Sequence, residues 1–335
     1  MEVRKNVSLK EYNTFAIEAR ADFLIEISEE QQLDEFFASE YKDGKYMFIG
    51  DGSNLLFVQD YKGCLVKMQT KGITSQKIAD NKILVKAKAG ENWDDFVRYC
   101  IEKGWNGLEN LALIPGKVGS TPVQNIGAYG REVKDFITKV FAYEIATGQR
   151  VVFNNEQCKF GYRDSIFKNE KKGRYVITEV EYCLSLNNEV NVQYEDIQKC
   201  LQATQQTASP KLVYEIVAQI RKQKLPDVKI LGNAGSFFKN PIIPRQQYEE
   251  LLRQYPLKCY PISDTLCKVP AAQLITLAGW KGYREGSVGV HTNQALVLVN
   301  YGGATGQEIK NLAEKIQKDV KKRYHVNIEM EVNLI

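Results

Sequence analysis

A serine in an unusual setting is the first candidate for chemistry. Residues 232–241 read Gly-Asn-Ala-Gly-Ser-Phe-Phe-Lys-Asn-Pro, with Ser236 near the centre. A nucleophilic serine needs a histidine base that a third group orients, but the sequence offers only His291 and His325, neither in a hydrolase-like context. On the residues alone, Ser236 is either the N-cap of a helix or a proton donor to something bound beside it. Pro241, five residues later, weakens the helix interpretation.

Two glycine-rich segments have the composition of anion-binding loops. One is Gly-Asp-Gly-Ser-Asn at 50–54, and the other covers residues 116–130. Glycines let backbone N–H groups approach phosphate oxygens closely. The Rossmann pattern is missing, because no third glycine follows Gly50 and Gly52 at the required place and a strand is predicted next. No Walker A sequence occurs in the chain either. Segment 50–54 alone is more typical of an ordinary turn, whereas a loop as long as 116–130 usually has a function.

An arginine and a glutamate are two further candidates. Arg163 offers a planar fork of donors that suits a carboxylate or a phosphate, and a surface ion pair with Asp164 is the alternative. Glu331 lies in an alternating sequence at 325–335, on the face opposite the apolar stripe. Its side chain is therefore expected to point either to solvent or into a cleft.

The sequence pattern also predicts the elements that position these residues. Residues 92–103 form an amphipathic helix followed by Gly104, and a capping box from Thr305 to Glu308 begins another. Other predicted helices cover 29–43, 195–206, 211–223, 244–255 and 270–279, and predicted strands cover 46–50, 55–58, 83–90, 136–144, 149–153, 175–186 and 295–300. Because strands and helices do not alternate regularly, the pattern predicts an α+β fold and disfavours a doubly wound parallel sheet.

Composition excludes several classes of protein. The 335 residues carry 45 basic and 41 acidic side chains without a basic cluster, so no nucleic-acid partner is expected. No apolar run reaches the length of a membrane span, and the first residues do not resemble a signal peptide; both observations predict a cytoplasmic protein with no membrane partner. The seven cysteines form no Cys-x-x-Cys pair and are expected to be reduced, and with only two histidines no metal site is predicted.

Taken in order along the chain, these segments resemble the UDP-N-acetylenolpyruvoylglucosamine reductase family. The resemblance extends from about residue 13 to the last residue. It rests on the segments at 13–27, 48–57, 108–133, 161–168, 224–227, 232–241, 270–282 and 291–300 and on the terminal Glu-Val pair at 331–332. The resemblance implies NADPH-dependent reduction of UDP-N-acetylglucosamine enolpyruvate to UDP-N-acetylmuramate, through a hydride relay by FAD, in bacterial peptidoglycan synthesis.

The family fold implies a particular domain organisation. A PCMH-type (vanillyl-oxidase-like) FAD-binding domain is expected at 17–187, with subdomains at about 1–65 and 66–187. An α+β substrate-binding domain is expected at 188–320, including an insertion loop at 189–210, and a C-terminal strand that carries Glu331 is expected at 321–335. In this fold FAD is held by backbone-rich loops, which gives both glycine-rich segments a role. The chain is expected to be a monomer.

Matching positions imply roles for individual residues. Arg163 and Glu331 are assigned to the substrate carboxylate, where Glu331 helps only if protonated or bridged by water. Ser236 is assigned as proton donor to a carbanion that is basic enough to need no triad. Cofactor binding is assigned to Gly50, Gly52, Ser53, Asn54, Gly116, Ser120, Gln124, Asn125, Gly127 and Ala128, and substrate binding to Tyr162, Tyr194, Lys224, Asn240 and Gln294.

Two positions depart from the family pattern. Asn333 stands where the family usually has arginine, and Asp51 stands where a third glycine is common, which adds a negative charge to a phosphate loop. Two alternatives to the reductase stay open. One is another flavoprotein of this fold, an oxidase or dehydrogenase of different alcohols, for which covalently attached flavin would be the sign. The other is a non-enzymatic UDP-sugar-binding module, which would bind UDP-sugar as a colourless protein.

Overall fold

The computed structural model describes residues 1–335 and divides into two compact units, each built from discontinuous segments. The first unit contains residues 1–7, 21–51 and 62–222, and the second contains 8–20, 52–61 and 223–335. The division differs from the predicted domain boundaries in two ways. Residues 188–222 belong to the first unit, and two short segments from the first 61 residues complete the second.

A four-stranded sheet in the first unit leads into the first glycine-rich segment. In order across the sheet, its strands are β1 (Val3–Ser8), β2 (Arg20–Ile27), β5 (Tyr61–Met68) and β3 (Tyr46–Ile49). Helix α1 (Gln32–Ala38) buries Leu33 and Phe36 in the core of this part. Strands β3 and β5 are parallel and place Ile49 beside Lys67. The sheet thereby fixes the point where Gly50 and Asp51 leave β3.

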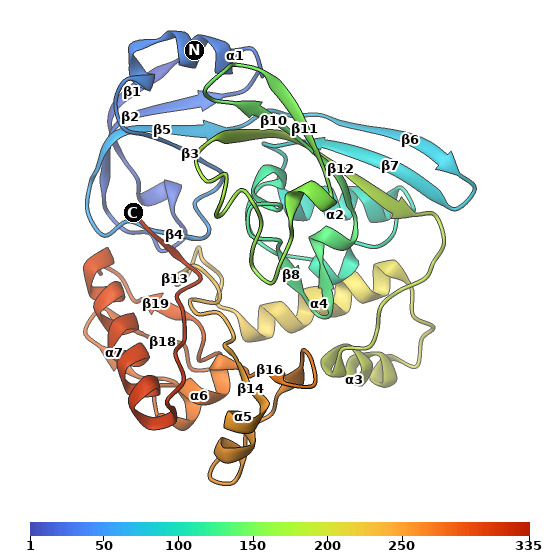
Figure 1. Ribbon diagram of the computed structural model, residues 1–335, viewed down its shortest axis with the longest axis vertical. Coiled ribbons are helices and arrows are strands. Elements are labelled where there is room, and N and C mark those ends of the chain that lie inside the picture. Colours follow the sequence, from blue (N-terminus) through green and yellow to red (C-terminus); the bar gives the residue numbers. More distant parts are fainter. The chain divides into compact units, whose positions relative to one another are not determined.

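A five-stranded antiparallel sheet forms the larger core of the first unit (Figure 1). Its strands are β11 (Arg150–Asn154), β10 (Ile137–Glu144), β12 (Tyr175–Ser185), β7 (Lys82–Lys88) and β6 (Ile73–Ala79). Helix α2 (Trp93–Glu102) begins where the Asn92 side chain accepts a hydrogen bond from the Asp95 amide, and it buries its predicted apolar face in the same core.

The segment after this sheet stays with the first unit because its apolar residues are buried there. It contains α3 (Glu195–Thr204) and α4 (Pro210–Lys224). Ile197 of α3 and Val213, Ile216 and Val217 of α4 form one buried cluster with Ala112, close to the second glycine-rich segment. Burial of these side chains explains why the boundary at 187, which the family resemblance implies, does not coincide with a boundary between the units.

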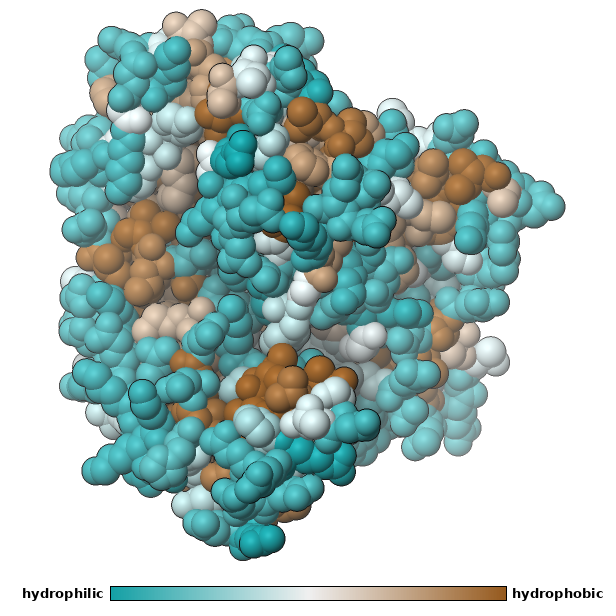
Figure 2. Space-filling view, in the orientation of Figure 1, coloured by the Kyte–Doolittle hydropathy of each residue, from teal (hydrophilic) through white to brown (hydrophobic).

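The second unit combines small sheets with three helices. Its strands are β13 (Gly232–Asn233), β19 (Leu298–Asn300), β18 (Val288–Val290) and β17 (Arg284–Glu285) in one sheet, β14 (Ile242–Pro244), β16 (Leu266–Lys268) and β15 (Tyr260–Pro261) in another, and β4 (Leu55–Leu56) with β20 (Asn333–Leu334) as a parallel pair. Its helices are α5 (Arg245–Leu252), α6 (Ala271–Leu277) and α7 (Gly306–Tyr324). Figure 2 shows an apolar area where Figure 1 places β14 and β16.

Short elements complete both units. The strands β8 (Gly127–Ala128) and β9 (Arg131–Glu132) form a small hairpin in the first unit. Single turns of 3₁₀ helix cover Lys10–Tyr12, Glu40–Lys42, Glu109–Leu111, Val118–Ser120, Val133–Asp135 and Glu156–Cys158. No helix is long and apolar enough to cross a membrane.

The predicted capping box is present at the start of α7. The Thr305 side chain accepts a hydrogen bond from the Glu308 amide, and the Glu308 carboxylate accepts one from the Thr305 amide. Replacing Thr305 with alanine is expected to cost about 1 kcal/mol and to lower the midpoint of thermal unfolding by about 2 to 4 °C, measured by circular dichroism. Thr292→Ala, at an exposed position outside any helix, is the control and should not shift the midpoint. An unchanged midpoint in Thr305→Ala would contradict this role for the box.

Two sequence expectations are wrong. The chain is still helical up to Tyr324, and within 321–335 only Asn333–Leu334 is a regular strand, although Val326, Ile328 and Val332 are buried in the predicted alternation. The segment alternates because it lies extended on the second unit, but it pairs with neighbours at only a few residues. The N-cap interpretation of Ser236 is also wrong, because the first helix after Ser236 begins only at Arg245.

All cysteines are free thiols, and four of them, Cys64, Cys100, Cys158 and Cys267, are buried. Burial raises the pKa of the Cys64 and Cys158 thiols to about 12, because the thiolate would lose its hydration. In the native protein we therefore expect a chromogenic thiol reagent to modify only the partly exposed Cys183, Cys200 and Cys259 quickly. All seven should react after unfolding. A fourth fast thiol in the native protein would contradict this expectation.

Candidate active site

The predicted site residues fall into both units, and each unit gathers its own set. The first unit holds Gly50, Gly116, Ser120, Gln124, Asn125, Gly127, Ala128, Tyr162, Arg163 and Tyr194. The second unit holds Gly52, Ser53, Asn54, Lys224, Ser236, Asn240, Gln294 and Glu331.

The first cavity brings the two glycine-rich segments of the first unit together. It has a volume of about 160 Å³, and one part of its wall is formed by Gly50 from one segment and Lys117, Gly119 and Ser120 from the other. The remaining wall is mostly apolar and includes Phe48, Met68, Val123, Phe167 and Ile177. A ligand that combines an apolar ring with phosphate groups suits such a lining.

The backbone of the second glycine-rich segment is held firmly in place. Gly116 has a φ of +125° and accepts a hydrogen bond from the Trp93 amide at 3.0 Å. The Asn125 side chain donates to the Glu132 carboxylate and to the Gly161 carbonyl, and it accepts from the Lys134 amide. Because both amide hydrogens of Asn125 are engaged by the protein, this residue shapes the loop, and its backbone is the part that remains for a ligand.

Arg163 lies on a strained turn and is held against the glycine-rich segment. Its φ is +53°, a left-handed conformation that costs a non-glycine residue roughly 1 kcal/mol. The guanidinium donates to the Gly127 carbonyl at 2.8 Å and lies over the Tyr162 ring at 5.5 Å from its centroid. Lys168 donates to the Arg163 carbonyl and to Gln124. Strain at such a residue is a pointer to function.

Arg221 is a second guanidinium near Arg163 that sequence reasoning missed. Burial lowers the pKa of Arg221, the nearby charge of Arg163 adds to this effect, and a hydrogen bond with Tyr129 opposes it. The Arg221 Nε is buried without a hydrogen-bond partner. The Tyr129 ring in turn meets the Tyr194 ring edge to face, with centroids 5.1 Å apart. Two neighbouring guanidinium groups and two tyrosines form a group of side chains that can bind an anion.

In the second unit, Ser236 lies between two other predicted segments. The amide of the next residue, Phe237, donates to the Leu296 carbonyl at 2.7 Å, and the Phe237 carbonyl accepts from the Glu331 amide at 2.7 Å. The segment that contains Ser236 is therefore paired on one side with the turn after Gln294 and on the other with the extended chain at Glu331. The Ser236 side chain is partly exposed, so its hydroxyl can reach a ligand.

The rest of the first glycine-rich segment belongs to this neighbourhood. Gly52 has a φ of +66°, and a Cβ there would lie 1.9 Å from the Tyr12 carbonyl oxygen, so only glycine fits. The Asn54 side chain donates to the Glu331 carbonyl, and Asn333 donates to the Asn54 carbonyl through both its backbone and its side chain. Asn333 thus has a structural task where the family usually has arginine.

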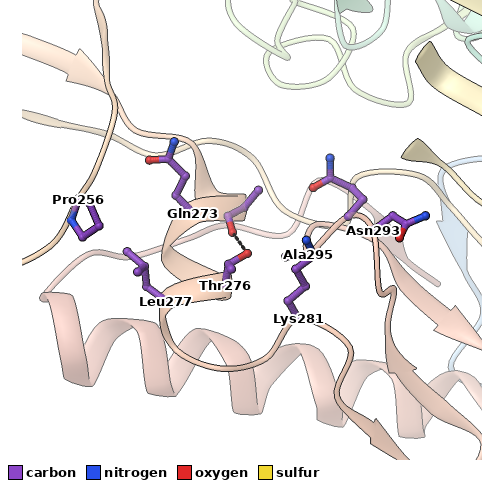
Figure 3. Close-up of a pocket in the computed structure, with 9 residues that line it drawn as sticks. Pro256, Gln273, Thr276, Leu277, Lys281, Asn293 and Ala295 are labelled. Carbon is purple, nitrogen blue, oxygen red and sulfur yellow. Dashed lines mark hydrogen bonds between the residues drawn. The ribbon is translucent and has the colours of Figure 1, made fainter. Parts of the chain in front are cut away.

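A second cavity lies beside α6, and Figure 3 shows Gln273, Thr276 and Leu277 of that helix facing it. Its volume is about 340 Å³, and Gln294 from the predicted substrate set contributes to its lining. Asn240 lies outside this lining, where its side chain accepts a hydrogen bond from the Ala271 amide at the start of α6. The volume lies within the range of small-molecule sites.

One charged residue at this cavity was not predicted: Lys281 contributes a cation to its wall. His291 is not part of the lining, but its Nδ1 atom is buried without a hydrogen-bond partner. Burial lowers the pKa of His291, and the charge of Lys281 lowers it further, so the imidazole is neutral at pH 7. Local sequence gave no signal for Lys281, because the cavity forms only after distant segments fold together.

Comparisons with known proteins agree with this geometry. A family model described as an FAD binding domain matches residues 21–154, and one described as the C-terminal domain of UDP-N-acetylenolpyruvoylglucosamine reductase matches residues 225–335. The UDP-N-acetylenolpyruvoylglucosamine reductase of Flavobacterium johnsoniae is 47% identical over 100% of both chains. That of Chromobacterium violaceum is 45% identical over 99% of this chain and 98% of its own. The solved reductase structure from Thermus caldophilus, at 22% identity and a TM-score of 0.67, covers 100% of this chain and 99% of its own, and it shares the fold.

The FAD-binding match, together with full-length relatives that are named as reductases, defines the chain as an FAD-dependent oxidoreductase. The relatives at more than 40% identity share one name, and the chain belongs to the UDP-N-acetylenolpyruvoylglucosamine reductase family. The predicted fold class, family and FAD cofactor are therefore confirmed, and the two alternative functions are set aside. The residues of the first cavity fit the cofactor, since glycine backbone and Ser120 line one wall and apolar side chains line the rest.

Proposed function

We propose that the chain reduces UDP-N-acetylglucosamine enolpyruvate to UDP-N-acetylmuramate with NADPH as the reductant, using Ser236 as the proton donor. The observation that carries the proposal is the double pairing of Phe237, which brings Ser236 next to both Glu331 and the turn after Gln294. When bound, FAD supplies a hydride to the substrate that it has received from NADPH. The protein then has to stabilise the negative charge on the substrate and protonate its carbanion.

Stabilisation of the negative charge is assigned to Arg163, and protonation of the carbanion is assigned to Ser236. The guanidinium of Arg163 is already positioned by Gly127 and Tyr162, so it can hold the substrate carboxylate without reorganising. The Ser236 hydroxyl is a weak acid, but an enolate-like carbon is a strong enough base to take its proton. Glu331 is assigned to the same carboxylate, in a protonated or water-bridged form.

Substrate binding is assigned to Tyr162, Tyr194, Lys224, Asn240 and Gln294. Tyr194 lies against Tyr129, beside the pair of guanidinium groups, which suits a tyrosine that covers an anionic nucleotide. Gln294 and Lys281 offer an amide and a cation at the second cavity, which is large enough for part of a UDP-sugar. The Asn240 side chain accepts a hydrogen bond from the Ala271 amide, which fixes this assigned residue at the start of α6.

Cofactor binding is assigned mainly to backbone. Gly50 and Ser120 line the first cavity, while Gly116, Asn125, Gly127 and Ala128 shape the loop around them. Gln124, held by Lys168, and Gly52, Ser53 and Asn54 complete the proposed set. Most residues assigned to FAD lie in the first unit, whereas the residues assigned to substrate come from both units, and the insertion at 189–210 packs on the first.

Two half-reactions, followed by flavin absorbance, test the proposal. The purified protein should be yellow, NADPH should bleach it, and addition of the enolpyruvyl substrate without oxygen should restore the colour and yield UDP-N-acetylmuramate. The same measurement with NADH shows whether the 2′-phosphate of NADPH contributes to the rate of flavin reduction. A colourless protein that FAD does not reconstitute, or a reduced flavin that the substrate does not re-oxidise, would contradict the proposal. The monomeric state and cytoplasmic location stay predictions, checked by sedimentation and cell fractionation.

A further inference from the structure

Asp51 lies between two lysines at the wall of the first cavity. Its Oδ1 atom is 3.4 Å from the Lys117 Nζ and 3.9 Å from the Lys67 Nζ. The two lysine side chains are only 11% and 16% exposed. Salt screens such partly buried charges less than surface charges, so the contacts persist at physiological ionic strength. The negative charge that Asp51 brings to the glycine-rich segment is thereby met by two cations of the same unit.

The fold fixes all three side chains independently of one another. Asp51 follows β3, and Lys67 is next to the end of β3 because Ile49 and Lys67 are partners in the parallel pairing of β3 with β5. Lys117 comes from the other glycine-rich segment, where its backbone pairs with Asn92 and the next amide donates to the Glu91 carbonyl. A Cβ on Gly50 would lie 3.3 Å from the Lys117 Cγ, so the lysine stem runs directly over this glycine.

Lys117 is the one cationic side chain that lines the first cavity, and the Tyr175 ring with its hydroxyl, Gly50, Gly119 and Ser120 also belong to the lining. Backbone N–H groups carry only partial charges, whereas the ammonium group is a full and mobile positive charge on a flexible stem. A phosphate group in this cavity would find Lys117 within reach. Asp51 holds that ammonium at the cavity wall before any ligand arrives.

We propose that Lys117 binds the pyrophosphate of FAD and that Asp51 is the residue that positions it. The proposal rests on FAD as the cofactor of this chain. When the Lys117 ammonium turns toward a phosphate oxygen, Lys67 remains within ion-pair distance of Asp51, so the carboxylate does not face the phosphate without a cation. The aspartate that replaces a common glycine of the family is then part of the binding site and does not weaken it.

Titration of apoprotein with FAD, followed by flavin fluorescence, tests this assignment. Lys117→Met keeps most of the stem and removes the charge, and we expect it to raise the Kd for FAD by about 10- to 100-fold at low salt, as for loss of one charge-assisted hydrogen bond. The Kd for riboflavin, which has no phosphate, should change by less than about twofold, because the lost interaction acts on phosphate alone. Lys117→Arg keeps the charge and should stay within about threefold of the wild type.

The substitution Asp51→Asn distinguishes two roles for Asp51, which are positioning of Lys117 and electrostatic repulsion of the phosphate. If Asp51 holds Lys117, the substitution raises the Kd for FAD in the wild type and no longer raises it when residue 117 is methionine, which is the coupling expected of two interacting residues. Circular dichroism of each apoprotein checks that the variants are folded. Tighter FAD binding by Asp51→Asn would overturn the positioning role. The phosphate contact would be overturned if Lys117→Met weakened the binding of FAD and of riboflavin equally, or left the Kd for FAD unchanged. A wild-type protein that does not bind FAD would instead overturn FAD as the cofactor.

Discussion

Replacing Ser236 with alanine is expected to leave reduction of the flavin by NADPH at its wild-type rate and to slow re-oxidation by the enolpyruvyl substrate by a factor of about 10² to 10⁴, the usual contribution of a positioned acid. Hydride transfer to the flavin needs no proton from Ser236, whereas the substrate carbanion does. The surrounding backbone is held by the Phe237 hydrogen bonds, which alanine preserves. Rapid mixing in an anaerobic spectrophotometer resolves the two half-reactions.

The control for this prediction is Ser263→Ala, an exposed serine in the loop between β15 and β16. It should leave both half-reactions unchanged. Ser236→Cys, which keeps an acidic hydrogen, should retain more of the second half-reaction than alanine does. Equal loss of both half-reactions in Ser236→Ala would show that the serine supports the fold or the cofactor, and full retention of both would remove it from catalysis.

Arg163→Ala is expected to have the second largest effect, slowing substrate-dependent re-oxidation by about 10² to 10³, the cost of removing one donor to a developing negative charge. Arg163→Lys keeps the charge but loses the planar fork, so an intermediate loss is expected. Both variants lose the hydrogen bond from the Arg163 guanidinium to the Gly127 carbonyl. The FAD content of each variant must therefore be measured alongside the rates.

Arg131→Ala is the matched control, since this arginine is in the neighbouring hairpin and lies over the Phe136 ring. It should change neither half-reaction by more than about twofold, because a single cation–π contact contributes little. If Arg163→Ala re-oxidises at the wild-type rate with full FAD content, the carboxylate has another partner, and Arg221 becomes the first residue to test.

Helices with strong periodicity and caps could be predicted almost completely from the sequence. The predicted helix at 92–103 is α2, and the capping box at Thr305 begins α7, whose inward residues Ile309, Leu312 and Ile316 are all buried. These elements follow from side chains within one or two turns of each other. The segment after Tyr324 differs, since its conformation depends on distant partners such as Phe238, which bridges to Met330.

The candidate site could be predicted where a motif is contiguous and not where it depends on tertiary contacts. Ser236, Arg163 and the glycine-rich segments stand out as local patterns in the sequence. Lys117, Arg221 and Lys281 are ordinary basic residues there, and each gains meaning only through the cavity, ring or carboxylate that the fold places beside it. The charge of Asp51 likewise looked unfavourable until its two lysine partners were located.

The discontinuous build of the second unit sets the order in which the protein can mature during synthesis. Residues 62–222 of the first unit are contiguous and can begin to fold while the rest is still being made. The segment at 52–61 must wait, because Asn54 meets Glu331 across 277 residues of sequence and β4 pairs with β20. Until residues 331–335 leave the ribosome, Ser236 lacks its neighbour Glu331 and the loop at Gly52 is held at one side only. The segment that contains Ser236 therefore gains one of its two backbone pairings only after residue 331 has been made.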